Sequence, residues 1–322
     1  MKCSILTVAL AVLTAAASTV ASAQSAWPAK PVKIIAVFPP GGSVDQVARV
    51  FAAQLTQQLG QQIIVDNRGG ASGSIGTQVV ATSPADGYTF GIVFDTHAVN
   101  PSLIPNIPFD TLKDLAPVML VGTSPMAIVA HVTQPYKDFR DLLAAAKREP
   151  VPFGSIGTGS LGHLAMLQIA NLAHVEFTHI PYRGGGPLMT DAVGGQVPVA
   201  IGTVFLVNPH VKSGKLKALA VTSDKPSPQM PGVGTVAQQG VPGFSALSWW
   251  GVIAPAGTPP AIVKRMHDEL AKALANPSVA EKLTAQGMDI VGGGPAELDK
   301  FLRGEMARWS QVVKANKIQA GD

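Results

Sequence analysis

Two glycine-rich stretches, each lying between a β-branched run and a helical pattern, have the residue types of an anion-binding site. The first, residues 38–43, reads FPPGGS, and the second, residues 155–160, reads SIGTGS. The first amides of a helix have no partner within it and carry partial positive charge, and glycine lets a ligand approach the backbone. These two segments, called here the first and second glycine loops, therefore predict sites for a carboxylate or phosphate at helix starts.

An ordinary tight turn before a well-capped helix is the competing interpretation of the first glycine loop. Ser43 and Gln46 have the spacing of a capping box, in which each side chain bonds the other residue's backbone amide. In that case the prolines fix the direction of the chain and the glycines only allow the turn. The loop taken alone supports both interpretations.

The second glycine loop also matches the dinucleotide-binding pattern G-x-G-x-x-G, from Gly157 to Gly162. It follows a predicted strand and opens a predicted helix, and Glu176 lies downstream at about the ~20-residue spacing of a ribose-binding acid. However, Glu176 precedes the next predicted strand, whereas the ribose-binding acid belongs at the carboxyl end of a strand. Dinucleotide binding is therefore the second interpretation, and we expect no cofactor.

Motifs for catalysis are weak in this sequence. The stretch Ser72-Gly73-Ser74-Ile75-Gly76 comes near G-x-S-x-G, but a glycine-rich loop entering a helix explains it as well. The seven histidines contain no H-E-x-x-H pattern, so no metal site is expected. A secreted enzyme, either NAD-dependent or using a serine near Ser74 or Ser160, remains the rival interpretation because catalytic triads assemble from distant residues.

Residues 1–23 have the three parts of a secretory signal peptide: Lys2, the apolar stretch 5–13 and the cleavage signature Ala21-Ser22-Ala23. The apolar stretch is shorter than the ~20 residues of a membrane span. Removal of the segment also removes Cys3, the single cysteine of the 322-residue chain, so disulfides and thiol chemistry are excluded. Loss of Lys2 lowers the net charge from +4 to +3, which gives no reason to expect a nucleic-acid partner.

Short β-branched runs alternate with helical patterns along the rest of the chain, which predicts α/β layers with largely parallel sheets. The predicted strands are residues 32–38, 63–65, 89–94, 126–131, 152–156, 177–180, 197–201, 216–221 and 249–254. Apolar spacing predicts helices over 46–59, 138–148 and 162–172, and proline and glycine signals divide residues 258–322 into three more. The two glycine loops repeat one plan about 115 residues apart, which would place one in each of two similar lobes.

A series of short motifs also occurs in order along essentially the whole mature chain. They are Trp27-Pro28-Ala29-Lys30-Pro31, VFPPGGSVD (37–45), Asp66-Asn67-Arg68 with Gly73-x-x-Gly76, Asp86-Gly87-Tyr88-Thr89, Thr96-His97-Ala98-Val99-Asn100-Pro101, Gly157-Thr158-Gly159-Ser160 with His163, Pro181-Tyr182-Arg183-Gly184 and Ala254-Pro255-Ala256-Gly257-Thr258-Pro259. Each is weak alone, but the ordered set resembles the Bug family, the extracytoplasmic solute receptors of tripartite tricarboxylate transporters.

The resemblance implies an α/β fold: a two-lobed periplasmic binding protein (type II-like, Venus flytrap), each lobe being a mostly parallel sheet flanked by helices. Lobe 1 would comprise residues 24–124 plus 245–322, and lobe 2 residues 125–244. The implied function is reversible capture of a small organic acid in the interlobe cleft, without enzymatic activity. A monomer in the periplasm would then deliver the acid to the large and small membrane subunits of a tripartite transporter.

The resemblance also implies a set of ligand-binding residues. The two glycine loops would bind a carboxylate, partly through ordered water, and a loop at the cleft edge of lobe 1 and a loop of lobe 2 would complete the site. Arg183 would either bind a distal carboxylate through its planar fork or remain a solvated cation. The implied residues are Phe38, Pro40, Gly41, Gly42, Ser43, Asp45, Thr96, His97, Ser155, Gly157, Thr158, Gly159, Ser160, His163, Tyr182, Arg183, Gly184 and Thr203.

The chain departs from the family pattern at Gly202, where many relatives have an acidic residue, so this side of the cleft is not expected to bind an ammonium group. Asp95 could supply such a charge, but capping of the following turn is the preferred interpretation. A plain carboxylate is therefore favoured over an amino acid. Trp249 and Trp250 alternate on a predicted strand, and a core position is expected for both, although one of the two could reach the cleft.

Overall fold

The computed structural model describes residues 27–315 and residue 318, so the predicted signal peptide lies outside the described residues. Ten strands form one continuous sheet in the order β2-β1-β3-β9-β4-β7-β5-β6, and β10 and β8 also pair with β4. The strands are β1 (Val32–Ala36), β2 (Ile63–Asn67), β3 (Thr89–Phe94), β4 (Leu115–His131), β5 (Val151–Ser155), β6 (Phe177–Pro181), β7 (Val199–Thr203), β8 (Leu216–Val221), β9 (Leu247–Pro255) and β10 (Asp289–Gly293).

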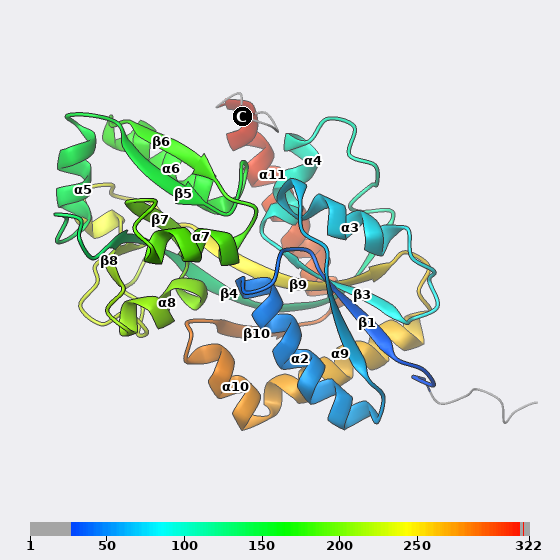
Figure 1. Ribbon diagram of the computed structural model, residues 1–322. Helices are drawn as coiled ribbons and strands as arrows, with labels where there is room; N and C mark the ends of the chain where they lie inside the picture. Colours follow the sequence, from blue (N-terminus) through cyan, green and yellow to red (C-terminus); the bar gives the residue numbers. More distant parts are fainter. Residues whose placement is uncertain (1–26, 316–317, 319–322) are drawn as a thin grey trace, which may run out of the picture.

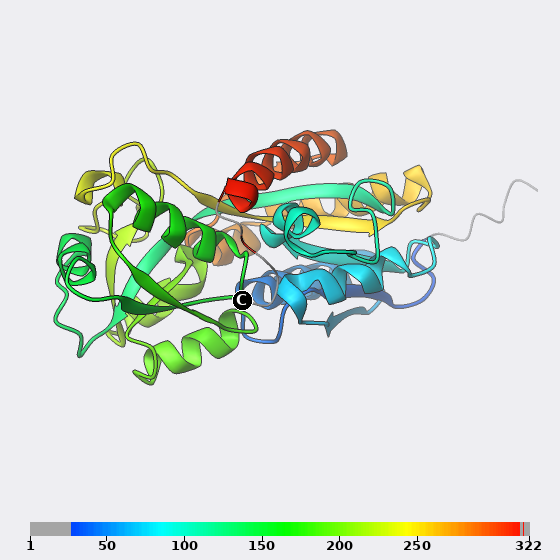
Figure 2. The same ribbon diagram turned by 90° about the horizontal axis from the view of Figure 1, so that it is seen from above.

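Helices flank this sheet, and the sheet and helices together form two lobes, which Figures 1 and 2 show from two directions. They are α2 (Ser43–Leu59), α3 (Ser74–Ala81), α4 (Thr96–Leu103), α5 (Phe139–Ala146), α6 (Leu161–Ala173), α7 (Gly185–Val193), α8 (Val204–Lys212), α9 (Pro260–Ala275), α10 (Pro277–Thr284) and α11 (Pro295–Ala315). Two short 3-10 turns, η2 (Ala71–Gly73) and η3 (Ala237–Gln239), complete the described elements. Within the described residues no helix is long and apolar enough to cross a membrane.

Strand β4 connects the two lobes and changes partners along its length (Figure 1). Up to Pro125 it pairs with β9, and from Met126 onward it pairs with β7 and β8. The part called here lobe 1 contains β1, β2, β3, β9, β10, the first part of β4 and the helices α2–α4 and α9–α11. Lobe 2 contains the remaining elements, α5–α8 and β5–β8, together with the end of β4.

The two-lobed α/β prediction is confirmed, but the sheet is mixed rather than mostly parallel. Parallel pairs join β1 to β2 and β3, and β5 to β6 and β7. The pairs that involve β4 and the β3–β9 pair are antiparallel. The reason is that β4 leaves lobe 1 and β9 returns to it, so these two strands run in opposite directions through the connection.

Local sequence signals fix the helix ends that position the cleft. Helix α2 stops at Gly60, whose left-handed backbone (φ 64°) returns its amide to the carbonyl of Thr56. Helix α9 begins at Pro260 and ends before Asn276-Pro277, and α11 begins at Pro295, as the proline signals predict. These C-terminal helices pack on lobe 1 in both views (Figures 1 and 2).

Trp249 and Trp250 are both fully buried, as expected for alternating side chains of a central strand. The Trp249 ring contacts Phe301 of α11 with a centroid distance of 5.4 Å. The Trp250 ring lies on the other face, 5.2 Å from Phe94 and 5.4 Å from Phe205 of lobe 2. Trp250 therefore forms part of the core where the two lobes meet, in contact with an aromatic side chain from each.

Candidate functional site

The first glycine loop meets the start of α7 where the two lobes touch. A Cβ atom added at Gly42 would lie 3.5 Å from the amide nitrogen of Gly185, and one at Gly41 would lie 3.8 Å from the Cα of Gly186. A Cβ at Gly186 would overlap the carbonyl oxygen of Pro40. Glycine is therefore required at Gly186 for the two loops to approach this closely.

Helix α2 presents an uncapped amino-terminal end to this junction. Its N-cap residue is Gly42, with an extended backbone (φ −80°, ψ 169°), and no described side chain caps it. The predicted capping box is wrong: Ser43 is already the first residue of the helix, and Gln46 donates its side-chain amide to the carbonyl of Gly41 at 3.2 Å. The first amides of α2 therefore remain available to an external acceptor.

Helix α7 presents a second uncapped end from lobe 2. Its N-cap residue Gly184 has φ 127°, a conformation that favours glycine, and no described side chain caps the helix. Both helix ends carry partial positive charge, so their approach is unfavourable unless a negative charge lies between them. This electrostatic arrangement suits an anion such as a carboxylate.

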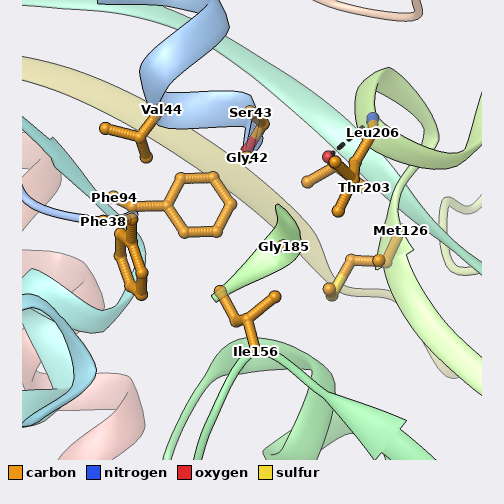
Figure 3. Close-up of a pocket in the computed structure, with 11 residues that line it drawn as sticks. Phe38, Gly42, Ser43, Val44, Phe94, Met126, Ile156, Gly185, Thr203 and Leu206 are labelled. Atoms are coloured by element: carbon orange, nitrogen blue, oxygen red, sulfur yellow. Dashed lines mark hydrogen bonds between the residues drawn. The ribbon is translucent and has the colours of Figure 1, made fainter. Parts of the chain in front are cut away.

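Between these ends lies a small pocket with mostly apolar walls (Figure 3). Its lining residues are Phe38, Gly42, Ser43, Val44, Phe94, Met126, Ile156, Gly185, Gly202, Thr203 and Leu206. The pocket volume is about 10 Å³, which is room for roughly one water molecule. The hydroxyl of Thr203 accepts a hydrogen bond from the Leu206 amide at 3.1 Å and so caps α8. Thr203 therefore both caps this helix and lines the pocket.

A wider groove of about 980 Å³ lies at the junction of the lobes and shares the lining residues Phe38 and Ile156 with the pocket. Its lining residues are Phe38, Pro39, Pro40, Asn67, Gly69, Gly70, Ala71, Ser72, Ile75, Leu103, Ile104, Ile156, Gly157, Thr158, Pro181, Tyr182 and Arg183. Most of these are apolar, Arg183 is the charged residue among them, and neither aspartate nor glutamate is present. The groove is therefore suited to an apolar body with acidic groups rather than to a cation.

Asp45 stabilises the first glycine loop through hydrogen bonds. It accepts hydrogen bonds from the Gly41 amide, the Arg49 Nε and the Asn67 Nδ2, each at 3.0 Å. Burial alone would raise the pKa of Asp45, but the hydrogen bonds from Arg49, Gly41 and Asn67 outweigh it and hold the pKa below its ordinary value. Asp45, expected to contact the ligand, is thus engaged in holding the loop.

Three amides of the second glycine loop, those of Gly157, Gly159 and Ser160, have hydrogen-bond acceptors within the chain. The Gly157 amide donates to the Ser155 Oγ at 3.3 Å, the Gly159 amide to the His163 Nδ1 at 3.0 Å, and the Ser160 amide to the carbonyl of Gly157 at 3.1 Å. The Ser160 hydroxyl caps α6 by accepting the amide of His163. A loop side chain, a loop carbonyl and His163 of α6 satisfy these three donors, which the glycine pattern alone cannot indicate.

A serine of this loop and a histidine of β6 form a pair that bears on the enzyme alternative. The Ser155 Oγ lies 2.7 Å from the His179 Nε2, and the Ser160 Oγ donates to the Ser155 Oγ at 3.2 Å. Both serines are fully buried. Burial lowers the pKa of His163 to about 4, and burial together with the neighbouring His163 lowers that of His179 to about 3. Weakly basic imidazoles and inaccessible hydroxyls are unsuited to nucleophilic catalysis.

Thr96, His97 and Asn100 lie on helix α4, whereas the family resemblance implies a loop at this position. His97 is buried and lines a separate small cavity against α11, with Leu298 as one of its neighbours, so it does not face the interlobe groove. Burial lowers the pKa of His97 to about 4. Asn100 donates to the carbonyl of Ser72 at 3.0 Å and so fixes the loop before α3. Pro101 within the helix explains why α4 was not predicted.

Tyr182 and Arg183 line the groove from lobe 2, as the sequence comparison implies. The Tyr182 hydroxyl donates to the Asp191 Oδ2 at 3.0 Å, and burial together with Asp191 raises the pKa of Tyr182 to about 12. The Arg183 side chain is exposed at the edge of the groove.

Several residues that shape the junction were not identified from the sequence. Ser72 donates its hydroxyl to the carbonyl of Thr158 at 2.8 Å, a hydrogen bond between the lobes. Leu103 of α4 packs directly on Gly159 and leaves no room for a side chain there, and the positive φ of 73° at Gly159 also favours glycine. Gly185 begins α7, and the sequence Gly184-Gly185-Gly186-Pro187 is a helix-start signal that could have been read as such. No group of three or more candidate metal ligands occurs within the described residues.

Two lobes joined by crossing strands, with a binding groove between them, define a periplasmic binding protein. A family model described as the tripartite tricarboxylate transporter family receptor matches residues 47–318. The chain belongs to this family of solute-binding receptors, and the resemblance to the Bug proteins is confirmed.

Individual relatives cover nearly the whole chain. BugT of Bordetella pertussis is 39% identical, over 89% of this chain and 90% of its own length. The structure of periplasmic binding protein BugD superposes with a TM-score of 0.87 and 30% identity, covering 91% of this chain and 99% of its own. The structure of R. palustris Rpa4515 with adipate gives a TM-score of 0.87 and 33% identity, with coverages of 91% and 99%. Membership in this family indicates a periplasmic protein.

Proposed function

We propose that the protein captures a small organic carboxylate between the starts of α2 and α7 and releases it unaltered. The observation that carries this proposal is the approach of two uncapped helix ends, Gly42 and Gly185, from opposite lobes. A carboxylate between them would accept hydrogen bonds from both ends and offset their partial charges. Because the pocket has room for roughly one water, binding would require the lobes to separate and close again.

The groove supports a ligand with an apolar body. Its walls combine Pro39, Ile75 and Leu103 with the exposed cation Arg183, and its lining contains no acidic residue to bind an ammonium group. A carboxylate with an apolar chain or ring, extending toward Arg183, fits these properties better than an amino acid. The relative Rpa4515, whose structure holds adipate, supports the same ligand chemistry. Contacts from the second glycine loop, Thr96 and His163 remain predictions.

The strand pairing supports a hinge at the proposed lobe boundaries. Pro125 of β4 and Leu247 of β9 are cross-strand partners, β4 takes its lobe 2 partner β7 from Met126 onward, and β9 begins at Leu247. We place lobe 1 in residues 24–124 plus 245–322 and lobe 2 in residues 125–244, with closure by rotation about this pair. In the proposed cycle, residues 1–23 direct a non-enzymatic monomer to the periplasm, where it delivers its ligand to the large and small membrane subunits.

Thermal shift measurements on the purified mature chain test the function. We expect at least one acid of a panel of adipate, succinate, malate and benzoate to raise the melting temperature, since ligand at ~100 times its dissociation constant adds about 2.7 kcal/mol of stability. Mass spectrometry of the recovered acid should show it unchanged. Chemical conversion of the acid would support the enzyme alternative, and a panel without any effect would count against the proposed site.

A further inference from the structure

Asp95 is a completely buried acid that the proposed binding mode does not use. It follows β3 and precedes α4, and only 1% of its surface is exposed. The expectation that it caps the following turn is wrong, because its backbone is already helical (φ −49°, ψ −34°) and its side chain makes no cap hydrogen bond. Neither carboxyl oxygen has a hydrogen-bond partner among the described residues.

The groups around this carboxyl come from both lobes. The Ser248 hydroxyl on β9, which has no hydrogen-bond partner among the described residues, and the Leu161 amide at the start of α6 are the polar groups that lower the pKa of Asp95 most, although burial outweighs them. Glu305 on α11 is the charged group that acts on it. The titratable side chains near the starts of α4 and α6 are His97 and His163, which burial keeps neutral above a pKa of about 4. Among the residues that the structure describes, no positively charged group is found to act on Asp95.

Closure of the lobes would change the protonation of such a group. Asp95 belongs to lobe 1 and Leu161 to lobe 2, so separation of the lobes would remove α6 from the carboxyl and admit water. In the closed arrangement burial, and to a smaller extent the charge of Glu305, raise the pKa of Asp95 to about 7. A hydrated aspartate has a pKa of about 3.9. Between these values the closed protein binds the proton and the open protein does not.

We propose that Asp95 couples closure of the lobes to the uptake of one proton, so that the receptor holds its ligand more tightly in mildly acid than in alkaline solution. This inference rests on the proposed function, since it requires lobes that close on a ligand. The coupling follows from linkage: the state that binds more protons gains stability as the pH falls. Affinity should therefore rise as the pH falls from about 8 toward 4, the reverse of the effect expected from a buried neutral histidine.

Calorimetric titration with adipate at pH 6 and pH 8 tests the coupling. Carboxylates with ordinary pKa values near 4 stay largely ionised at both pH values, so the charge of adipate changes little. We expect about tenfold tighter binding at pH 6 than at pH 8. The variant Asp95→Asn, an uncharged isostere, should bind equally tightly at both pH values, and more tightly than the wild type does at pH 6, because its closure needs no proton. The control Asp289→Asn removes an exposed carboxylate of the same lobe and should keep the wild-type profile.

A measurement on the free protein separates this inference from the proposed function. Small-angle scattering should show a smaller radius of gyration at pH 6 than at pH 8 for the wild type. For Asp95→Asn the radius should be the same at both pH values and no larger than the wild-type value at pH 6. If adipate does not bind, that result bears on the proposed function, and the scattering alone decides on Asp95. Equal affinities and equal radii at the two pH values, or a pH dependence that survives in Asp95→Asn, would overturn the coupling.

Discussion

A carboxylate placed at Gly42 would occupy the proposed anion site from within the chain. The backbone of Gly42 is extended with a negative φ of −80°, so any residue can adopt it. A Cβ there meets the Gly185 amide nitrogen at 3.5 Å, an ordinary contact distance. The side chain of Gly42→Asp would thus reach the starts of α2 and α7 together, where the proposal places the ligand carboxylate.

The size of both expected effects follows from this geometry. An anion stabilises a helix start by about 0.3–1 kcal/mol, and two starts are within reach. Repulsion from Asp45 in the same turn lowers the gain, so we expect about 1 kcal/mol, or a rise in melting temperature of about 2 °C. For the ligand, a like charge at about 4 Å costs about 4 kcal/mol at an effective dielectric constant of 20. Affinity should fall by about a thousandfold.

Scanning calorimetry and titration with a carboxylate identified from the panel measure the two quantities on one sample. Gly42→Ala is the matched control, because it adds the same Cβ without charge and should retain binding within a few fold. The combination of higher stability and lost binding distinguishes occupation of the site from damage to the fold. Wild-type affinity in Gly42→Asp would refute the assignment of this site.

Three further substitutions address the surroundings of the site. Ser72→Ala removes the interlobe hydrogen bond to Thr158 and should weaken binding about fivefold, mainly through faster dissociation in stopped-flow experiments; an unchanged dissociation rate would mean that this bond does not hold the closed state. Asp45→Asn should lower stability by about 1–3 kcal/mol in urea at pH 7. The pKa of Asp45 is lower in the folded than in the unfolded protein, so its ionised form contributes to the free energy of unfolding above the unfolded pKa of about 3.9. This contribution is lost as the pH falls through the folded pKa, and the stability difference between Asp45→Asn and the wild type should then vanish. A stability difference that stays constant with pH would contradict this. Arg183→Gln should weaken binding of adipate about tenfold and leave a monocarboxylate unaffected, and equal losses for both acids would exclude a role in binding the distal group.

Much of the fold could be predicted from the sequence because its strands are short β-branched runs with clear boundaries. Strands β3 and β8 and the three C-terminal helices agree with the predicted segments closely. The first part of β4 was missed because Pro117, Gly122 and Pro125 suggest a loop, whereas the strand accommodates two of them at register shifts. Helices α7 and α8 contain Pro187 and Pro209, which break the periodic pattern on which helix prediction depends.

The binding site was predicted less completely, for a physical reason. Glycine patterns indicate where backbone amides are accessible, but they do not indicate which amides the folded chain already satisfies. The first glycine loop retains its free helix start, whereas the second is satisfied by Ser155 and His163. The position of α7 opposite Gly42 depends on how the lobes meet, which no local motif encodes.

The cross-strand partnership of Pro125 and Leu247 has a consequence for recombination between relatives. Adjacent strands lie about 4.8 Å apart, so the chain leaves for residues 126–246 and returns from them through an opening one strand wide. Such an insert can be exchanged as a cassette with two splice points and without new linkers. Chimaeras carrying this segment from a homologue would keep α2 and replace α7, and would reveal which half of the cleft selects the acid.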